Sequence, residues 1–220
     1  MIEEEWRLSR DARNMLAFLH GPVGMKPGHV PHSWRKYLKA AVDSDTLKVS
    51  VRKLMLFTAA CAWRLSHEHQ DLSLRKVLDD IQCDMTDQAE RAADEPEDAD
   101  INVRMLPFYL NYEAVCNIAC RQPELEACEE WAQQSDNLRE IFGNPFRPGQ
   151  VDPAWLAWEG GTVVKLAQGI YDQQAFDRMP ILADALEDAG CCDRRFLEHS
   201  RGPEPHVRGC WLIDCLLNKS

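Results

Sequence analysis

The chain has 220 residues, of which 45% are hydrophobic and 28% charged, so it is long and apolar enough to bury a core. Its net charge of −11 disfavours nucleic-acid backbones and anionic membrane surfaces as partners. The acidic start MIEEEWRLSR has no apolar core like that of a signal peptide, and no apolar run reaches the roughly 18 residues of a spanning helix. With nine cysteines and no export signal, we expect reduced thiols and a soluble, cytoplasmic protein.

Helical periodicity dominates the N-terminal part, which we delimit as residues 1–143. A helix is predicted with Ser9 or Asp11 as its N-cap and Gly21 as its end. A stronger signal covers residues 51–65, where apolar side chains recur at spacings of three and four. This part is therefore predicted to be helical from its beginning.

Further helices are predicted in the same part. One begins after Ser33, and another begins at Ser73 and ends before the acidic run DEPEDAD, residues 94–100. That run is predicted to be a solvated loop. Pro107 is expected in the first turn of the following helix, where proline is tolerated. The stretch PELEACEEWAQQSDNLREIF is then helical again.

The clearest break in the chain is GNPFRPGQVDPAW, with three prolines and two glycines. After it we predict a compact four-helix unit, residues 151–220. Thr162 opens its first helix, Pro180 lies in the first turn of the second, and Asp193 caps the third. The fourth, HVRGCWLIDCLLNK, contains Gly209, where glycine costs about 1 kcal/mol relative to alanine. We therefore expect another helix to cross closely at Gly209.

Alternation of period two never persists along the chain, so strands are not expected. The sequence predicts an all-α protein of about nine or ten helices, forming an irregular helical bundle. Its two parts, 1–143 and 151–220, are expected to pack as one body.

Several long motifs resemble a large family of uncharacterised planctomycete proteins. They are IFGNPFRP, DPAWL, TVVKLAQGIYDQQAFDRMPILADALEDAGC and RGPEPHVRGCWLIDCLLNK, and the segments RNMLAFLHG and SVRKLMLFTAACAWR look like the opening helices of the same family. The middle, roughly residues 71–131, matches only in being helical. The resemblance implies kinship and brings no activity, ligand or fold with it.

The chain also departs from that family. The family usually has a cysteine pair followed by two basic residues where this chain has Cys61, Ala62, Trp63 and Arg64. It often has cysteine at the position of Ser200 and glycine at the position of Glu204. If those cysteines bind a metal in the family, this chain lacks some of the ligands, which counts against a metal site.

A metal site is nevertheless one candidate at the C-terminus. Cys191 or Cys192, together with His199, His206 and Cys210, supplies four nitrogen and sulfur donors of the kind that zinc prefers. The spacing C-x7-H-x6-H-x3-C has long gaps for a compact zinc finger. In the alternative, the cysteines face the core and the histidines lie at helix ends. We expect no cofactor, with zinc as the alternative.

A second histidine group is SHEHQD, with His67 and His69. Residues two apart on a helix point to different faces, so both can bind one metal only if the helix has ended. His29 and His32 lie in a predicted loop that would complete such a cluster. A polar helix end is the favoured interpretation.

A third candidate is the basic stretch after residue 190. It holds Arg194, Arg195, Arg201 and Arg208, and its helix pair is compatible with a helix-turn-helix. In an acidic protein these arginines are expected to form intramolecular pairs, for which the nearby partners are Glu187, Asp188, Glu198 and Asp214. If they are not so paired, these arginines with His199 and His206 form the predicted partner-binding surface.

Two tryptophans, Trp155 and Trp158, lie at helical spacing beside a glycine pair. Exposed tryptophans would mark a binding surface, whereas buried ones would stabilise the C-terminal unit. Burial is favoured.

Function is predicted largely by exclusion. The sequence contains no P-loop, G-x-G-x-x-G, G-x-S-x-G or H-E-x-x-H motif, and we assign no catalytic residue. The leading hypothesis is a non-enzymatic helical protein-interaction module, an adaptor or regulator with a protein partner. The alternative is a metal- or nucleic-acid-linked module that uses the C-terminal His/Cys/Arg cluster.

Overall fold

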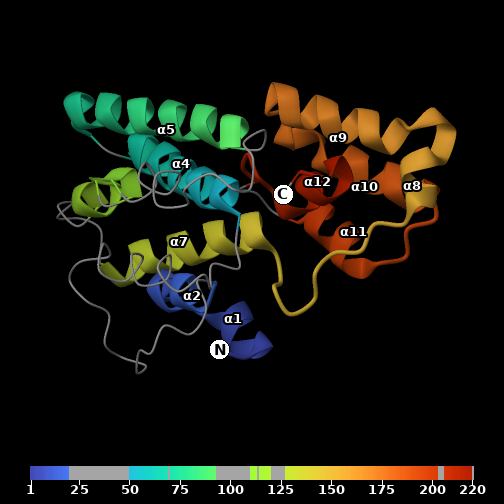
Figure 1. Cartoon of the computed structure of the whole chain (residues 1–220), viewed down its shortest axis with the longest axis horizontal. Coiled ribbons are helices and arrows are strands. Elements are labelled where there is room, and N and C mark those ends of the chain that lie inside the picture. The colour runs from blue at the N-terminus through green and yellow to red at the C-terminus, as the bar shows by residue number, and fades with distance from the viewer. Residues whose placement is uncertain are drawn as a thin grey trace. The chain divides into compact units, whose positions relative to one another are not determined.

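The computed structural model describes residues 1–19, 50–68, 70–92, 110–112, 114–119, 127–202 and 206–219. Within these ranges all regular elements are helices and there is no strand, which confirms the predicted all-α fold (Figure 1). None of the described helices is long and apolar enough to cross a membrane. The predictions made for Gly21, Ser33, Pro107 and the acidic loop fall outside the described residues.

The chain divides into two compact units, Met1–Arg139 and Glu140–Ser220. The division lies inside helix α7 (Ala127–Phe142), so residues 140–142 of that helix belong to the second unit. The expectation that the two parts pack as one body stays a prediction.

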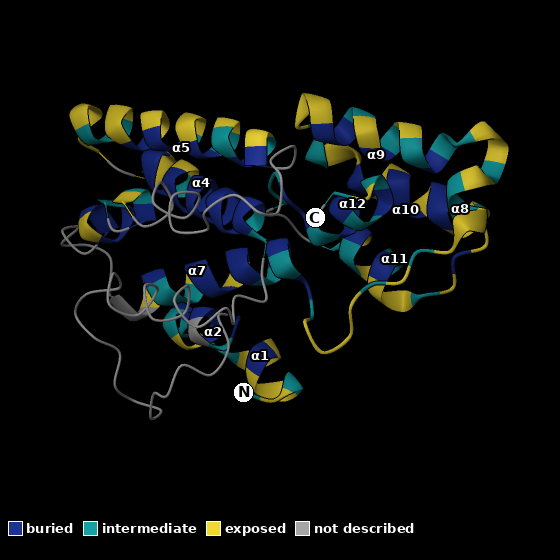
Figure 2. Ribbon diagram, in the orientation of Figure 1, coloured by how far each residue is buried: buried dark blue, intermediate teal, exposed yellow. Residues whose placement is uncertain are grey.

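The first unit contains α1 (Glu3–Leu8), α2 (Ala12–Leu19), α4 (Val51–Glu68), α5 (Leu72–Ala92) and most of α7, and residues 110–112 and 114–119 are also helical. The prediction for residues 51–65 is confirmed, and this helix continues to Glu68. α4 packs along α5 and is the most buried helix of the unit, whereas α5 is exposed along much of its surface (Figure 2). Buried side chains surround most of α4, which is the pattern of a helix that lies in the core.

Two of the predicted helix starts are refined by side-chain contacts. The backbone N–H of Arg13 donates to Asp11 Oδ1 at 3.1 Å, so Asp11 and not Ser9 caps α2. The N–H of Ser73 donates to Asp71 Oδ1 at 2.8 Å. Asp71 therefore caps α5, and Ser73 lies in its first turn instead of beginning it.

The core of the first unit contains a chain of buried polar side chains. Tyr112 donates its hydroxyl hydrogen to Gln134 Oε1 at 2.6 Å, and Gln134 Nε2 donates to Glu130 Oε1 at 2.7 Å. Arg64 forms an ion pair with the same Glu130 carboxylate. Because each of these side chains provides a polar partner for the next, the four residues form a structural network within the core.

The second unit confirms the predicted four-helix arrangement. Its longer helices are α9 (Thr162–Gln173), α10 (Met179–Asp188), α11 (Arg194–Arg201) and α12 (Trp211–Leu217), preceded by the single turn α8 (Pro153–Ala157). Short 3-10 turns, η1 (Trp158–Gly160) and η2 (Phe176–Arg178), precede α9 and α10. The expected starts at Thr162, Pro180 and Asp193 agree with the structure, since Pro180 lies in the first turn of α10 and Asp193 caps α11.

The core of this unit is contributed by all four longer helices. Phe196 of α11 is fully buried and contacts Trp155 and Trp211 edge-to-face, with ring centroids 5.6 and 5.3 Å apart. Leu186, Leu212 and the residues around them complete the same cluster. Burial of this apolar surface is the main stabilising contribution to the unit.

The last helix begins later than predicted, which corrects the interpretation of Gly209. α12 starts at Trp211, and Gly209 lies in the preceding turn with φ +91°. The N–H of Cys210 closes that turn by donating to the carbonyl of Val207 at 3.0 Å. Glycine is needed there because a left-handed backbone strains other residues, and no helix crossing is required to explain it.

Close packing against a glycine occurs instead at Gly143, which ends α7 with φ +63°. A Cβ at this position would lie 2.9 Å from Trp211 Cγ. We expect Gly143→Ala to lower the free energy of unfolding by about 1–3 kcal/mol, because it adds both backbone strain and a steric overlap. Urea unfolding monitored by tryptophan fluorescence measures this change.

Gly169→Ala is the matched control for that substitution. Gly169 lies inside α9, and a Cβ there meets no atom within 4 Å. Alanine at this helical position should raise the free energy of unfolding by up to about 1 kcal/mol. Equal effects of the two substitutions would show that Gly143 has no special role.

Candidate metal centre

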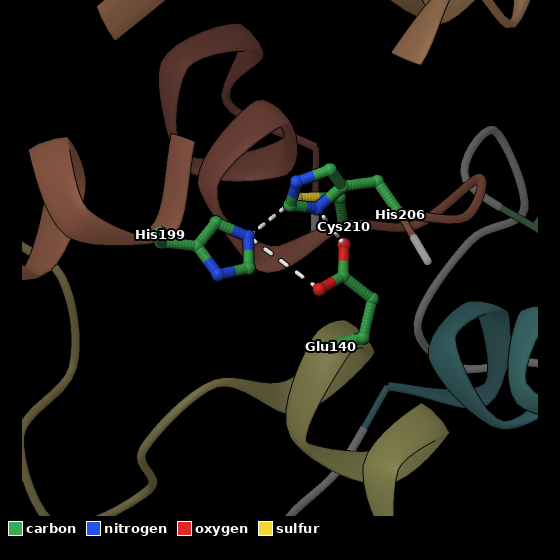
Figure 3. A group of neighbouring side chains, drawn as sticks. All are labelled: Glu140, His199, His206 and Cys210. Carbon is green, nitrogen blue, oxygen red and sulfur yellow. Dashed lines mark hydrogen bonds and ion pairs between the residues drawn. The ribbon is translucent and has the colours of Figure 1, made fainter. Parts of the chain in front are cut away.

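Four side chains of metal-ligand type converge in the second unit: Glu140, His199, His206 and Cys210 (Figure 3). Taking one ligand atom from each residue, all four atoms lie within 4.8 Å of one another. Glu140 lies in the last turn of α7, His199 lies near the end of α11, and the other two precede α12. The cluster therefore joins stretches of the chain that are about 60 residues apart in sequence.

The polar contacts within the cluster that the structure shows each involve Glu140 or Cys210. His206 Nδ1 is 3.0 Å from Glu140 Oε1, and His199 Nε2 is 3.5 Å from Glu140 Oε2. His199 Nε2 is also 3.1 Å from Cys210 Sγ. The two imidazole rings meet edge-to-face with centroids 4.9 Å apart. The carboxylate thus lies at the centre of the group, in contact with both histidines.

The shortest of these distances are compatible with a tetrahedral zinc site. With Zn–N and Zn–O bonds of about 2.0–2.2 Å and a Zn–S bond of about 2.3 Å, neighbouring ligand atoms lie about 3.3–3.6 Å apart. The three contacts of 3.0, 3.1 and 3.5 Å fall within a few tenths of an ångström of that spacing. The remaining pairs of ligand atoms are up to 4.8 Å apart, so the side chains have to rotate toward one another to enclose an ion.

Burial sets the protonation of two of the donors. It raises the pKa of the Cys210 thiol well above its usual range, and the Glu140 charge acts in the same direction, against the backbone N–H groups of Ile213 and Leu212. Burial lowers the pKa of His199, with His206 adding to that effect and Glu140 opposing it. His199 is therefore neutral at pH 7, the form that binds metal. Cys210 becomes a thiolate only when a cation is bound beside it.

Glu140 occupies an unusual position for a carboxylate. It lies in the last turn of α7, which Gly143 ends, and the C-terminal end of a helix dipole disfavours negative charge. Its side chain is also only 10% exposed. A cation bound beside it would stabilise a buried carboxylate at this end of a helix.

One ring nitrogen of His206 is buried without a hydrogen-bond partner among the described residues. Its side chain is 4% exposed, and its Nε2 atom is buried with no hydrogen-bond partner within the described part of the chain. A buried nitrogen without a partner costs about 1–3 kcal/mol. The ring nitrogen that faces the other three side chains is Nδ1, which contacts Glu140, so Nδ1 is the atom that would bind an ion in this cluster.

The geometry argues against a catalytic triad made of Cys210, His199 and Glu140. In a triad the histidine contacts the nucleophile with one ring nitrogen and the carboxylate with the other. Here the same atom, His199 Nε2, faces both the sulfur and the carboxylate. Cys210 is also fully buried and carries a raised pKa, so its thiol is not an activated nucleophile.

Three of the four ligands predicted from sequence are in this cluster, and Cys191 is not. Cys191 is buried in the hydrophobic core after the turn at Gly190, whose φ is +90°. Its neighbour Cys192 is exposed, with Sγ 3.7 Å from the Gly190 carbonyl. The turn that ends α10 therefore directs one cysteine into the core and the other to the surface.

Glu140 takes the place that sequence analysis gave to a cysteine. Its neighbours Leu138 and Ile141 are buried apolar residues. The sequence pattern around Glu140 is therefore that of an ordinary charged residue in an amphipathic helix. The one local signal is its position directly before IFGNPFRP, a motif of the family resemblance. The position of Glu140 beside this motif does not indicate that its carboxylate binds a metal.

The exposed arginines of α11 have acidic partners. Arg194 pairs with Glu198 at 2.7 Å, and Arg201 pairs with Glu187 at 2.6 Å and with Asp184 at 2.8 Å. Two of these partners, Glu187 and Glu198, are among those that the sequence suggested. Such pairs neutralise the charge that a nucleic-acid surface would need.

The remaining two arginines also have contacts within the unit. Arg195 pairs with Asp193 at 2.6 Å and donates to the carbonyl of Arg147 at 3.0 Å. The guanidinium of Arg208 lies 4.9 Å from the centroid of the Tyr171 ring. Arg208 thus contributes to packing beside α9 and is not displayed as an isolated surface charge.

The other candidates from sequence lie apart from this cluster. His67 is at the end of α4, where its ring stacks on Trp63 and its Nδ1 lies 2.8 Å from the Trp63 carbonyl oxygen. His29, His32 and His69 lie outside the described residues. Trp155 and Trp158 are both partly buried against the core of the second unit.

Comparisons of the chain with protein-family models, with curated proteins and with solved structures found no match. The resemblance to the planctomycete family therefore stays a prediction.

Proposed function

We propose that the C-terminal unit is a zinc-binding helical module in which Glu140, His199, His206 and Cys210 hold the ion. The observation that supports this proposal is the convergence of their four donor atoms within 4.8 Å. This is the metal-linked alternative inferred from the sequence, with Glu140 in place of Cys191. The protein-interaction module with a protein partner stays a prediction, and the ion pairs of α11 count against nucleic acid.

The donor set favours zinc over other common ions. Mg²⁺ and Ca²⁺ prefer six or more oxygen ligands, whereas this group offers one oxygen donor, two imidazoles and one sulfur. A thiolate and a carboxylate together carry two negative charges and balance a buried Zn²⁺ ion. Four donors from the protein leave no position for a reactive water, so the site is not arranged to hydrolyse a substrate.

Metal analysis of the untagged full-length protein tests the proposal. After expression with added zinc and removal of loosely bound metal, we expect about one equivalent of zinc per chain. Cys210→Ser and His206→Ala should each retain less than about a tenth of an equivalent, because each removes one of four ligands from a small buried site. Less than about a tenth of an equivalent in the unmodified protein would contradict the proposal.

Cys192→Ser is the matched control for Cys210→Ser. Both residues are free cysteines of the second unit, but Cys192 is exposed and lies outside the cluster. This control should keep the full zinc content. Equal loss of zinc from both cysteine variants would show that thiols bind zinc nonspecifically.

A further inference from the structure

The fold of the second unit does not depend on the cluster for most of its buried surface. Of the four ligands only Cys210 belongs to its hydrophobic core, which is otherwise built from α9 to α12. Small zinc domains that lack a core unfold without metal. The second unit differs from such domains, because it has a hydrophobic core in which Phe196, Leu186 and Leu212 are fully buried. This core stabilises the unit independently of a metal.

The four side chains also contact one another directly when no ion is bound. Glu140 contacts His206 at 3.0 Å and His199 at 3.5 Å, and His199 contacts the Cys210 sulfur at 3.1 Å. The Glu140 carboxylate therefore keeps polar neighbours when no ion is bound and is not left as an isolated buried charge, the arrangement that would force the unit open.

Exposure of the four ligands is graded across the cluster. Cys210 is fully buried and the side chain of His206 is 4% exposed, whereas those of Glu140 and His199 are 10% and 18% exposed. Solvent therefore reaches the cluster on the side of His199 and Glu140. A metal ion or a competing chelator has to approach from that side.

We infer that zinc at this cluster is exchangeable: the second unit keeps its fold when the ion leaves, and the ion passes His199 and Glu140. This inference rests on the proposed zinc binding. Cys210 and His206 act as the inner ligands, and His199 is the outer ligand that releases first. Such a site suits a protein that takes up and hands over zinc according to its availability.

Amide hydrogen exchange of the full chain tests the first half of the inference. Peptides from α9 (162–173) and α10 (179–188) are compared in the zinc-loaded and the chelator-treated protein. We expect exchange rates in these helices to differ by less than about threefold, since the core that protects them stays closed. Exchange at unprotected rates after zinc removal would overturn the inference while leaving zinc binding itself intact.

Zinc transfer to a chromophoric chelator tests the second half. His199→Gln should release zinc at least about tenfold faster than the unmodified protein, because it removes the outer ligand and keeps a polar side chain. His67→Gln, an exposed histidine of α4, is the control and should release zinc at the unmodified rate. Release that requires denaturant in every variant would contradict exchange, and failure of the unmodified protein to bind zinc at all would refute the proposed function as well.

Discussion

Zinc is expected to stabilise the unmodified protein strongly and to leave Cys210→Ser unaffected. A ligand that binds only the folded state adds about 4 kcal/mol when its free concentration is a thousand times the dissociation constant. For a unit of this size that corresponds to a rise of about 15 °C or more in the thermal midpoint. Serine cannot supply a thiolate, and Cys210 is the one sulfur ligand in the cluster.

The comparison uses the zinc-dependent difference within each variant, not the absolute midpoint. Cys210 is fully buried, so serine there also destabilises the metal-free protein. Thermal unfolding with zinc and with chelator, measured for the unmodified protein, Cys210→Ser and Cys192→Ser, separates these effects. A similar zinc-dependent rise in all three would mean that the ion binds elsewhere.

The largest loss of stability from a substitution outside the cluster is expected at Phe196. Its side chain is fully buried and contacts Trp155 and Trp211. Phe196→Ala should lower the free energy of unfolding by about 3–5 kcal/mol, because it removes a large apolar side chain and leaves a cavity. Urea unfolding followed by tryptophan fluorescence measures the loss.

Ile181→Ala is the control for Phe196→Ala. Ile181 lies on α10 and is 55% exposed, so its truncation should change the free energy of unfolding by no more than about 0.5 kcal/mol. Comparable losses at the two positions would mean that the core of the second unit is not where the structure places it. Trp211 also contacts the His199 ring, so the zinc content of Phe196→Ala is measured separately from its stability.

Helix positions were predictable because they depend on local patterns. Spacings of three and four identified α4, and Pro180 and Asp193 marked the beginnings of α10 and α11. Errors arose where local alternatives compete. Asp71 and Ser73 are both suitable caps, and only the backbone position of α5 decides between them. Gly209 fits a weak helix as well as a left-handed turn, and the turn is what forms.

The cluster was only partly predictable for a different reason. His199, His206 and Cys210 are close in sequence and of zinc-ligand type, so composition alone draws attention to them. Glu140 is about 60 residues away, and its approach depends on tertiary packing that no local pattern reports. Cys191 has suitable chemistry, but the turn at Gly190 places its side chain in the core.

Cobalt substitution tests the central claim most directly, because the spectrum reports both the geometry and the sulfur ligand. The zinc-free full-length protein is titrated with Co²⁺ and its absorption recorded. We expect intense visible bands of tetrahedral cobalt and a near-ultraviolet thiolate-to-metal charge-transfer band, saturating at about one equivalent and lost on addition of zinc. The charge-transfer band should be missing in Cys210→Ser and present in Cys192→Ser. A weak spectrum typical of six-coordinate cobalt, with no charge-transfer band, would contradict the zinc site formed by Glu140, His199, His206 and Cys210.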